Sequence, residues 1–217
     1  MKKFFLILAV MIIMSTTSYA AQNEIILPTV EVNSNELSVT EALQKRMSSR
    51  NFVDKDLTPA QMAKILWAAN GINRENGKRV NPAALGVYSV EVYAVTREGI
   101  YFYDATKNTL KLVAEGDYRS ITTTGQSFVG NAAVNLVYVE NPDAWKTARH
   151  TPPPRDAQIS FANVIAGAMA QSVALIAETE GLGNCVRGSI NRAEFAKIAR
   201  IPDEKNILLA QSVGKCN

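Results

Sequence analysis

Arg46-Met47-Ser48-Ser49-Arg50-Asn51-Phe52 is the stretch from which the fold and function of this chain are interpreted. It places two guanidinium groups and two hydroxyls within five residues, at the end of a predicted helix. Arg46 and Arg50 are four apart, so they share a face if the helix persists, and the serines add short donors. Such a cluster suits an anion, a phosphate above all. The alternative is a solvated helix end, where the dipole favours basic residues.

Residues 1–20 have the features of a signal peptide. Lys2 and Lys3 precede an apolar run over residues 4–14, and Ser18-Tyr19-Ala20 has the small-x-small pattern of a cleavage site. We expect cleavage after Ala20 and an exported protein, periplasmic or extracellular. The apolar run is short for a membrane span, so an uncleaved anchor is the weaker alternative. An extended arm over residues 21–36 and a single domain over residues 37–217 would follow.

The composition is that of a folded domain with a sizeable core, at 217 residues, 47% hydrophobic and 20% charged. Without Lys2 and Lys3, 21 basic residues face 20 acidic ones, and a net charge of +1 gives no support for a nucleic-acid partner. Cys185 and Cys216 could form a disulfide or remain free thiols. We expect no metal site, because the only histidine, His150, lies in a Pro-rich loop without other ligands at suitable spacing.

Helix start and stop signals are clear at several points. Ser38-Val39-Thr40-Glu41 and Thr58-Pro59-Ala60-Gln61 have the form of capping boxes. The first helix would run to the Arg46 cluster, and the second would end at Gly71, a good residue to follow a helix. The longest helix is expected over residues 159–180, ending at Gly181. Another follows an Asn191 cap and ends before Pro202.

Strands are expected between these helices. Alternating or apolar runs predict strands over residues 88–96, 134–139 and 207–213, and a hairpin of 99–104 with 110–113. Residues 185–190 form a short strand or turn, residues 117–130 are helical in part, and residues 72–81 form a loop. Residues 141–154, with three consecutive prolines, are an irregular excursion. Strands and helices mix without a βαβ rhythm, which predicts an α+β fold.

Searches for familiar catalytic patterns exclude several classes of enzyme. There is no G-x-S-x-G, and His150 has no acidic partner at a recognisable spacing, so nucleophilic catalysis is poorly supported. No G-x-G-x-x-G opens a helix after a strand, which weakens a dinucleotide-binding interpretation.

The chain nevertheless resembles the nitroreductase family over about residues 37–215. The resemblance rests on five motifs in family order, which together are fairly specific. They are residues 46–52, Leu66-Trp67-Ala68-Ala69-Asn70-Gly71, Asn81-Pro82-Ala83-Ala84-Leu85-Gly86-Val87-Tyr88, the helix containing residues 167–171, and Gly181-Leu182-Gly183-Asn184-Cys185-Val186-Arg187-Gly188. The match looks closest to the thiazoline/oxazoline dehydrogenase (SagB-like) branch.

This resemblance implies an FMN-dependent oxidoreductase with a central, mostly antiparallel sheet flanked by helices. It also implies a homodimer with flavin sites at the subunit interface. Arg46 and Ser48 would contact the ribityl and phosphate groups, and Arg50 the N1 edge of the ring, where a cation stabilises the negative charge of reduction. The other implied cofactor contacts are Pro82, Ala83, Ala84 and Gly86 at the pyrimidine edge, and backbone amides of Val186, Arg187 and Gly188 near N5 and O4.

Two features depart from the family pattern. Ala83 stands where members often have serine, so a side-chain hydrogen bond to the ring would be lost. The chain stops at Asn217, whereas many members continue into a tail with basic phosphate ligands, for which Lys215 or Arg192 could substitute. Family members place variable, often aromatic elements above the flavin, and Phe128 and Trp145 are candidates for this substrate pocket.

The prediction is therefore an exported FMN-dependent oxidoreductase. It would work by ping-pong hydride transfer through flavin N5, to or from a small organic substrate. No residue need act as a covalent nucleophile. The donor could be NAD(P)H or, since nicotinamide nucleotides are scarce outside the cytoplasm, a substrate oxidised directly. The alternative is a non-catalytic exported binding protein that keeps the fold, which the shortened tail and Ala83 favour.

Overall fold

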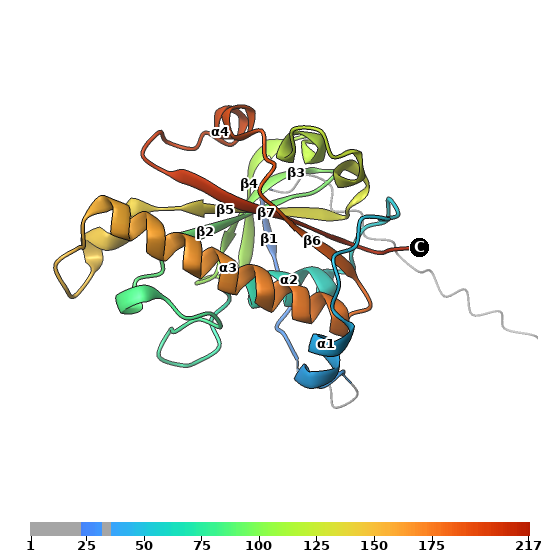
Figure 1. The fold of residues 1–217 in the computed structure, drawn as a ribbon, viewed down its shortest axis with the longest axis horizontal. Coiled ribbons are helices and arrows are strands. Elements are labelled where there is room, and N and C mark those ends of the chain that lie inside the picture. The colour runs from blue at the N-terminus through green and yellow to red at the C-terminus, as the bar shows by residue number, and fades with distance from the viewer. Residues whose placement is uncertain (1–22, 32–35) are drawn as a thin grey trace, which may run out of the picture.

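A seven-stranded sheet with helices on both faces forms the centre of the molecule (Figure 1). The computed structural model describes residues 23–31 and 36–217, so the predicted signal peptide lies outside the described residues. The strand order is β1-β4-β3-β2-β5-β7-β6, and every pairing is antiparallel. The strands are β1 Glu24–Ile26, β2 Val90–Val95, β3 Gly99–Asp104, β4 Thr109–Glu115, β5 Val134–Glu140, β6 Gly183–Arg187 and β7 Asn206–Gly214. The predicted α+β class with an antiparallel sheet is confirmed.

The helices begin where the capping signals predict. Ser38 and Thr58 each close a complete capping box, at the start of α1 (Val39–Lys45) and α2 (Pro59–Asn70). Asn191 caps α4 (Arg192–Ala199) through its side chain. Residues 117–130, predicted to be helical in part, form η2 (Arg119–Thr122) and most of η3 (Ser127–Asn131), two short 3₁₀ helices. Two more, η1 (Ala84–Gly86) and η4 (Pro142–Thr147), lie in the segments before β2 and after β5.

Gly71 ends α2 for a different reason from the one expected. Its backbone is extended, with φ −69° and ψ 158°, so no left-handed conformation calls for glycine here. A Cβ at this position would instead lie 2.4 Å from Cδ1 of Trp67. Glycine is needed because the chain passes close to the indole, whose Nε1 donates to the carbonyl of Ile72 at 3.1 Å.

The sheet is buried on both faces, which explains why its central strands read as continuous apolar runs. Val92, Leu136 and Tyr138 pack against α2 and the long helix α3 (Arg155–Thr179) on one side. Val137 and Val139, from the same β5 strand, pack with Phe195 of α4 on the other. Figure 1 shows the same layers, with α1, α2 and α3 below the sheet and α4 above it.

Helix α3 starts earlier than predicted, directly after Pro154, and packs on the part of the sheet formed by β2, β5, β7 and β6 (Figure 1). Its first residue, Arg155, forms a bidentate pair with the fully buried carboxylate of Glu140, which ties the start of α3 to the end of β5. By length and composition alone α3 could cross a membrane. One of its faces is buried against the sheet and α2, and the other leaves Val164 70% exposed.

Candidate functional site

The Arg46–Phe52 stretch is an extended segment and does not continue the helix. Helix α1 ends at Lys45, and the chain then runs beside β6, with a parallel bridge between Ser48 and Asn184 and a hydrogen bond from Ser49 N to Asn184 O of 2.8 Å. The helical spacing of Arg46 and Arg50 is therefore not what relates them. In an extended chain residues two apart point the same way, so Arg46, Ser48 and Arg50 still recur on one side.

Two glycines bring this segment close to β6. Gly181, at φ 65°, turns the chain after α3 in a conformation that favours glycine. Gly183 permits the close approach itself, because a Cβ there would lie 2.2 Å from Sγ of Cys216 and 2.8 Å from Cβ of Ser49. The two glycines of the Gly-Leu-Gly sequence after α3 are thus needed for different structural reasons.

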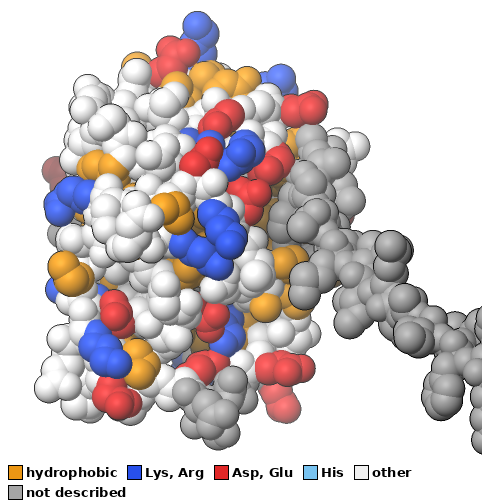
Figure 2. All heavy atoms as spheres, turned by 90° about the vertical axis from the view of Figure 1, so that its right-hand side faces the viewer, with side chains coloured by type: hydrophobic (Ala, Val, Ile, Leu, Met, Phe, Trp, Pro, Cys, Tyr) orange, Lys and Arg blue, Asp and Glu red, His pale blue; other side chains and the backbone are white. Residues whose placement is uncertain are grey.

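The two arginines of the segment are available for an anion. Arg46 is partly exposed and Arg50 exposed, and neither has an acidic partner among residues 23–31 and 36–217. Cζ of Arg50 lies 6.0 Å from the centroid of Phe128, and Phe128 in turn lies 6.1 Å from Phe52. Figure 2, which views the side where the chain ends, shows basic side chains gathered near its centre. The structure thus brings Phe128 to the Arg50 guanidinium.

The two suggested substitutes for tail ligands lie in different places. Lys215 follows β7, and its carbonyl accepts a hydrogen bond from Val53 N at 2.9 Å, so it is next to the Arg46–Phe52 stretch. Arg192 lies at the start of α4 and donates to the carbonyls of Ile207 and Leu208. Its guanidinium is thereby used to hold α4 on β7, so of the two only Lys215 is placed to join the cluster.

At residues 186–188, Val186 and Gly188 are exposed and Arg187 between them is buried. Val186 lies on the edge strand β6, two residues beyond the Asn184 bridge to Ser48, and is 42% exposed. Arg187 is buried, and its guanidinium donates inward, to Thr122 O at 2.7 Å, Asn135 Oδ1 at 3.0 Å and Ser212 Oγ at 3.1 Å. Burial without a carboxylate partner lowers the pKa of Arg187 to about 10. The Arg187 side chain is therefore turned away from any ligand beyond the edge, which leaves the main chain and the Val186 side chain to face it.

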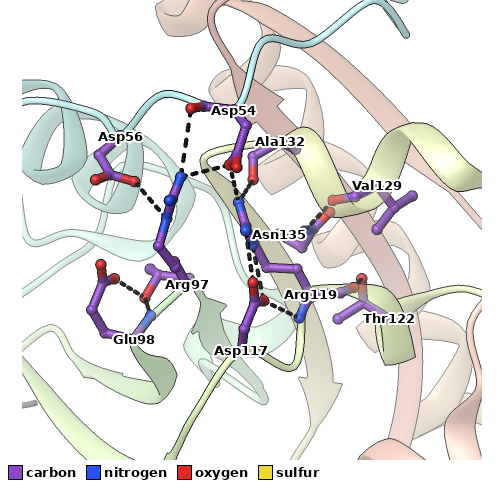
Figure 3. Close-up of polar contacts among 11 residues, drawn as sticks. Asp54, Asp56, Arg97, Glu98, Asp117, Arg119, Thr122, Val129, Ala132 and Asn135 are labelled. Carbon is purple, nitrogen blue, oxygen red and sulfur yellow. Dashed lines mark hydrogen bonds and ion pairs between the residues drawn. The ribbon is translucent and has the colours of Figure 1, made fainter.

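A second buried arginine fixes the far end of the Arg46–Phe52 stretch (Figure 3). The guanidinium of Arg119, in η2, makes two hydrogen bonds to Asp117 and donates to Asp54 Oδ1 at 2.9 Å and to Ala132 O at 3.2 Å. Hydrogen bonds to Asp117 raise its pKa, and they lower the pKa of Asp117 despite the opposing effect of burial. Asp54 also accepts from Arg97 at 2.6 Å. The loop of η2 is thus tied to the chain just after the stretch.

Arg119 and Arg187 hold the loops around the candidate site in place, a role that the sequence analysis did not predict. Thr122 connects them, because its hydroxyl donates to Arg119 O at 2.8 Å and its own carbonyl accepts from Arg187. Their partners are between 2 and 65 residues away along the chain. A pair of basic residues in η2 and β6 carries no local pattern that could have indicated this network.

The predicted segment 82–86 lies elsewhere, beside the N-terminal half of α3 (Figure 1). Pro82, Ala83 and Ala84 line a hollow of about 240 Å³ together with Phe161 and Val164. The segment is anchored by Asn81, which donates to the carbonyls of Ala68 and Ala69 and accepts from Ser172. Within one chain it is therefore apart from the arginines and β6.

Trp145 is also away from the arginine cluster and from Phe128. It is 3% exposed in η4, and its ring packs against Phe161 with centroids 6.3 Å apart. In this single chain the indole is therefore covered by its neighbours, and its place in a substrate pocket stays a prediction. Phe128 and Trp145 do not share a pocket in one chain.

Both cysteines are free thiols, Cys185 buried and Cys216 partly exposed. Burial raises the pKa of Cys216, against a smaller opposing effect of the hydrogen bond with Ser49. Over residues 23–31 and 36–217 no three His, Cys, Asp or Glu side chains are grouped as metal ligands.

The chain thus combines an antiparallel sheet flanked by helices with two arginines, without acidic partners among the described residues, beside the strand β6, which is an α+β architecture. The model of the nitroreductase family matches residues 43–215, and the chain belongs to that family. It is similar to a proposed nitroreductase of Methanocaldococcus jannaschii. The two are 27% identical over 195 residues, which cover 86% of this chain and 94% of the other.

Solved structures agree with this assignment. The chain is similar to a protein of Ralstonia eutropha described as a proposed nitroreductase, with 31% identity, a TM-score of 0.82 and 90% of each chain covered. It also shares its fold with the NADPH:FMN oxidoreductase of Vibrio harveyi, solved with NAD+, at 20% identity and a TM-score of 0.60, covering 82% of this chain and 69% of that one.

Proposed function

We propose that this nitroreductase-family oxidoreductase binds FMN between two copies of the chain and is exported. The observation that carries the proposal is the division of the implied cofactor contacts. Arg46, Ser48 and Arg50 lie beside β6, whereas residues 82–86 lie beside the N-terminal half of α3. One chain presents two halves of a site, and a second copy would bring the missing half to each.

The residues beside β6 have donor chemistry that fits the phosphate and ribityl groups of FMN. Two guanidinium groups without acidic partners and the exposed Ser48 hydroxyl can all donate to phosphate oxygens. The side-chain nitrogen of the buried Asn184, directly beside Ser48, has no hydrogen-bond partner among the described residues. A buried unsatisfied donor in this position supports a ligand or water at the edge.

The exposed face of α3 supports a homodimer. Val164 is 70% exposed next to the hollow formed with Pro82, Ala83 and Ala84. Burying such apolar surface favours association. A partner seated here would also stand against the segment implied to touch the pyrimidine edge.

When bound, FMN would supply the hydride transfer through N5, in a ping-pong reaction with a small organic substrate. The chain's own part is to bind and orient. Arg50 would hold a positive charge near N1, which favours the negative charge gained on reduction. The main-chain N–H groups at residues 186–188 would donate toward N5 and O4. The Phe128 ring, beside Arg50, would exclude water from this end of the site.

The proposal also covers export, the electron donor and the SagB-like branch of the family. The pattern of residues 1–20 supports a signal peptide cleaved after Ala20 and a periplasmic or extracellular location. NAD(P)H would be scarce there, so a substrate oxidised directly, as the SagB-like resemblance implies, is the favoured donor. NAD(P)H is the alternative, since the Vibrio harveyi relative is an NADPH:FMN oxidoreductase.

The first test is the visible absorption spectrum of the protein produced from residue 21, with the released chromophore identified by chromatography. We expect about one FMN per subunit. Arg46→Ala and Arg50→Ala should each lose FMN, while Lys197→Ala, an exposed charge on α4, should keep it. Val164→Glu should give a monomer in analytical ultracentrifugation and lose FMN with it. A colourless protein that takes up neither FMN nor FAD would contradict the proposal.

A non-catalytic binding protein is the second candidate, favoured by Ala83. In the structure Ala83 contributes only a methyl group to the hollow beside α3, where serine could donate a hydrogen bond. A stable dimer that binds FMN weakly and shows no turnover with any donor would support this candidate. Ala83→Ser should then tighten FMN binding.

A further inference from the structure

The guanidinium of Arg187, in β6, is held entirely by neutral groups. It makes five hydrogen bonds, as many as it has N–H groups. The acceptors are the carbonyls of Thr122 at 2.7 Å and Ser189 at 3.3 Å, the hydroxyls of Thr122 at 3.2 Å and Ser212 at 3.1 Å, and the side-chain oxygen of Asn135 at 3.0 Å. These hydrogen bonds satisfy the donors but leave the unit charge in place.

Arg119, which is also buried, shows the contrast. It pairs with the carboxylates of Asp117 at 2.7 Å and Asp54 at 2.9 Å, so its charge is neutralised locally. Arg187 forms no ion pair among the residues that the structure describes. Burial lowers the pKa of Arg187 to about 10, which still keeps the guanidinium cationic at neutral pH. The interior beside β6 therefore contains an uncompensated positive charge.

The place of this charge relates it to the candidate site. A buried cation without a counter-charge is unfavourable, because the interior solvates it less well than water does. Val186 and Gly188 are exposed and Arg187 between them is buried, so its charge lies behind the backbone that is implied to face N5 and O4 of the flavin. Protein transmits the field of a charge better than water. The charge can therefore act on the site without touching a ligand.

We propose that Arg187 is a positioning residue whose buried charge makes bound FMN easier to reduce. The charge, held behind residues 186–188, stabilises the negative charge that the flavin gains on reduction. The inference rests on the proposed function and deepens it, because it adds a second cation to Arg50. Arg50 is exposed, so water and salt screen its charge, whereas the charge of Arg187 is shielded from both.

The test is the midpoint potential of the bound flavin, measured at equilibrium with a redox dye. Arg187→Gln removes the charge and keeps a hydrogen-bonding side chain. We expect it to lower the equilibrium constant for two-electron reduction roughly tenfold, which corresponds to about 30 mV. Thr122→Val removes one acceptor of the same guanidinium and keeps the charge, so the potential should not change. Lys197→Gln, which removes an exposed charge on α4, should also leave it unchanged.

A purely structural role for Arg187 predicts a different result. Arg187→Gln and Thr122→Val would then shift the potential by similar amounts, because both disrupt the same hydrogen-bond network. That outcome overturns the inference. An FMN-loaded Arg187→Gln protein with the wild-type potential overturns it too, and leaves the proposed function standing. Wild-type protein that takes up neither FMN nor FAD overturns the inference together with the proposed function.

Arg187→Lys gives an independent test if Arg187→Gln does not fold. The introduced amine would be buried without a carboxylate, so its pKa would be lowered, whereas wild-type arginine keeps its proton. Below that pKa the variant carries the charge, and above it the charge is lost. A plot of midpoint potential against pH should therefore fall by an additional step that wild type lacks. A plot parallel to that of wild type from pH 6 to 10 overturns the inference.

Discussion

Gly183→Ala should damage the site and the fold together, because it fills the space through which the Arg46–Phe52 stretch approaches β6. The new Cβ would lie 2.2 Å from Sγ of Cys216, about 1.2 Å inside the distance at which ordinary contact begins. It would also lie 2.8 Å from Cβ of Ser49, which cannot swing away without its backbone. Overpacking of this kind costs about 1–3 kcal/mol, which lowers the melting temperature by roughly 2–4 °C per kcal/mol.

The assay combines urea unfolding with the rate at which Cys216 reacts with a thiol reagent. Gly183→Ala should lower the free energy of unfolding and expose Cys216, while the buried Cys185 stays unreactive. Adding Cys216→Ala removes the nearer clash and should recover about 1 kcal/mol in a double-mutant cycle. Gly130→Ala, where a Cβ meets nothing within 4 Å, is the control. Equal stability and thiol reactivity in the Gly183 and Gly130 variants would refute the close approach.

Three further changes test other parts of the fold. Burial raises the pKa of Tyr103 from 10.0 to about 12. The neutral phenol's contribution to folding stability is therefore complete below pH 10.0 and is lost as pH rises toward 12. Tyr103→Phe should lose less stability than wild type across that interval in alkaline unfolding curves. Arg155→Ala should cost roughly 3–5 kcal/mol in urea unfolding, because it leaves the fully buried Glu140 carboxylate without its cation; Arg155→Lys should cost less, and equal costs would contradict the pairing. Ser38→Ala removes the cap of α1 and should cost about 1 kcal/mol by the same method. The control Ser160→Ala, at an exposed position inside α3, should cost nothing, because alanine is the better helix former.

The elements that could be predicted from the sequence are those with local causes. The boxes at Ser38 and Thr58 fix the starts of α1 and α2, because a cap and its partner are three residues apart. The hairpin of β3 and β4 follows from its own turn. By contrast, the end of α1 at Lys45 depends on the pairing of Ser48 with Asn184, which is 136 positions later in the chain. No local signal distinguishes that outcome from a longer helix.

The residues of the candidate site also divide into those that a local pattern indicates and those that distant partners position. Arg46, Ser48 and Arg50 were identified from their residue types and from a helical spacing that the structure does not contain. The arginines still share a side because residues two apart in an extended chain point the same way. The inward direction of Arg187 and the burial of Trp145 follow from packing partners that are distant in sequence. That residues 82–86 lie apart from the arginines is likewise a property of the whole topology.

The strand order has a consequence for how the chain is made. Strand β6 joins the sheet only through β7, which comes last in the sequence and is inserted between β5 and β6. While a ribosome is still adding residues 206–214, the sheet has a gap where β7 belongs, and the edge beside Arg46–Phe52 has no support. Domains of this kind fold as units once complete. A chain that cannot close its sheet early is compatible with the proposed export, which would require it to pass a translocation pore before it folds.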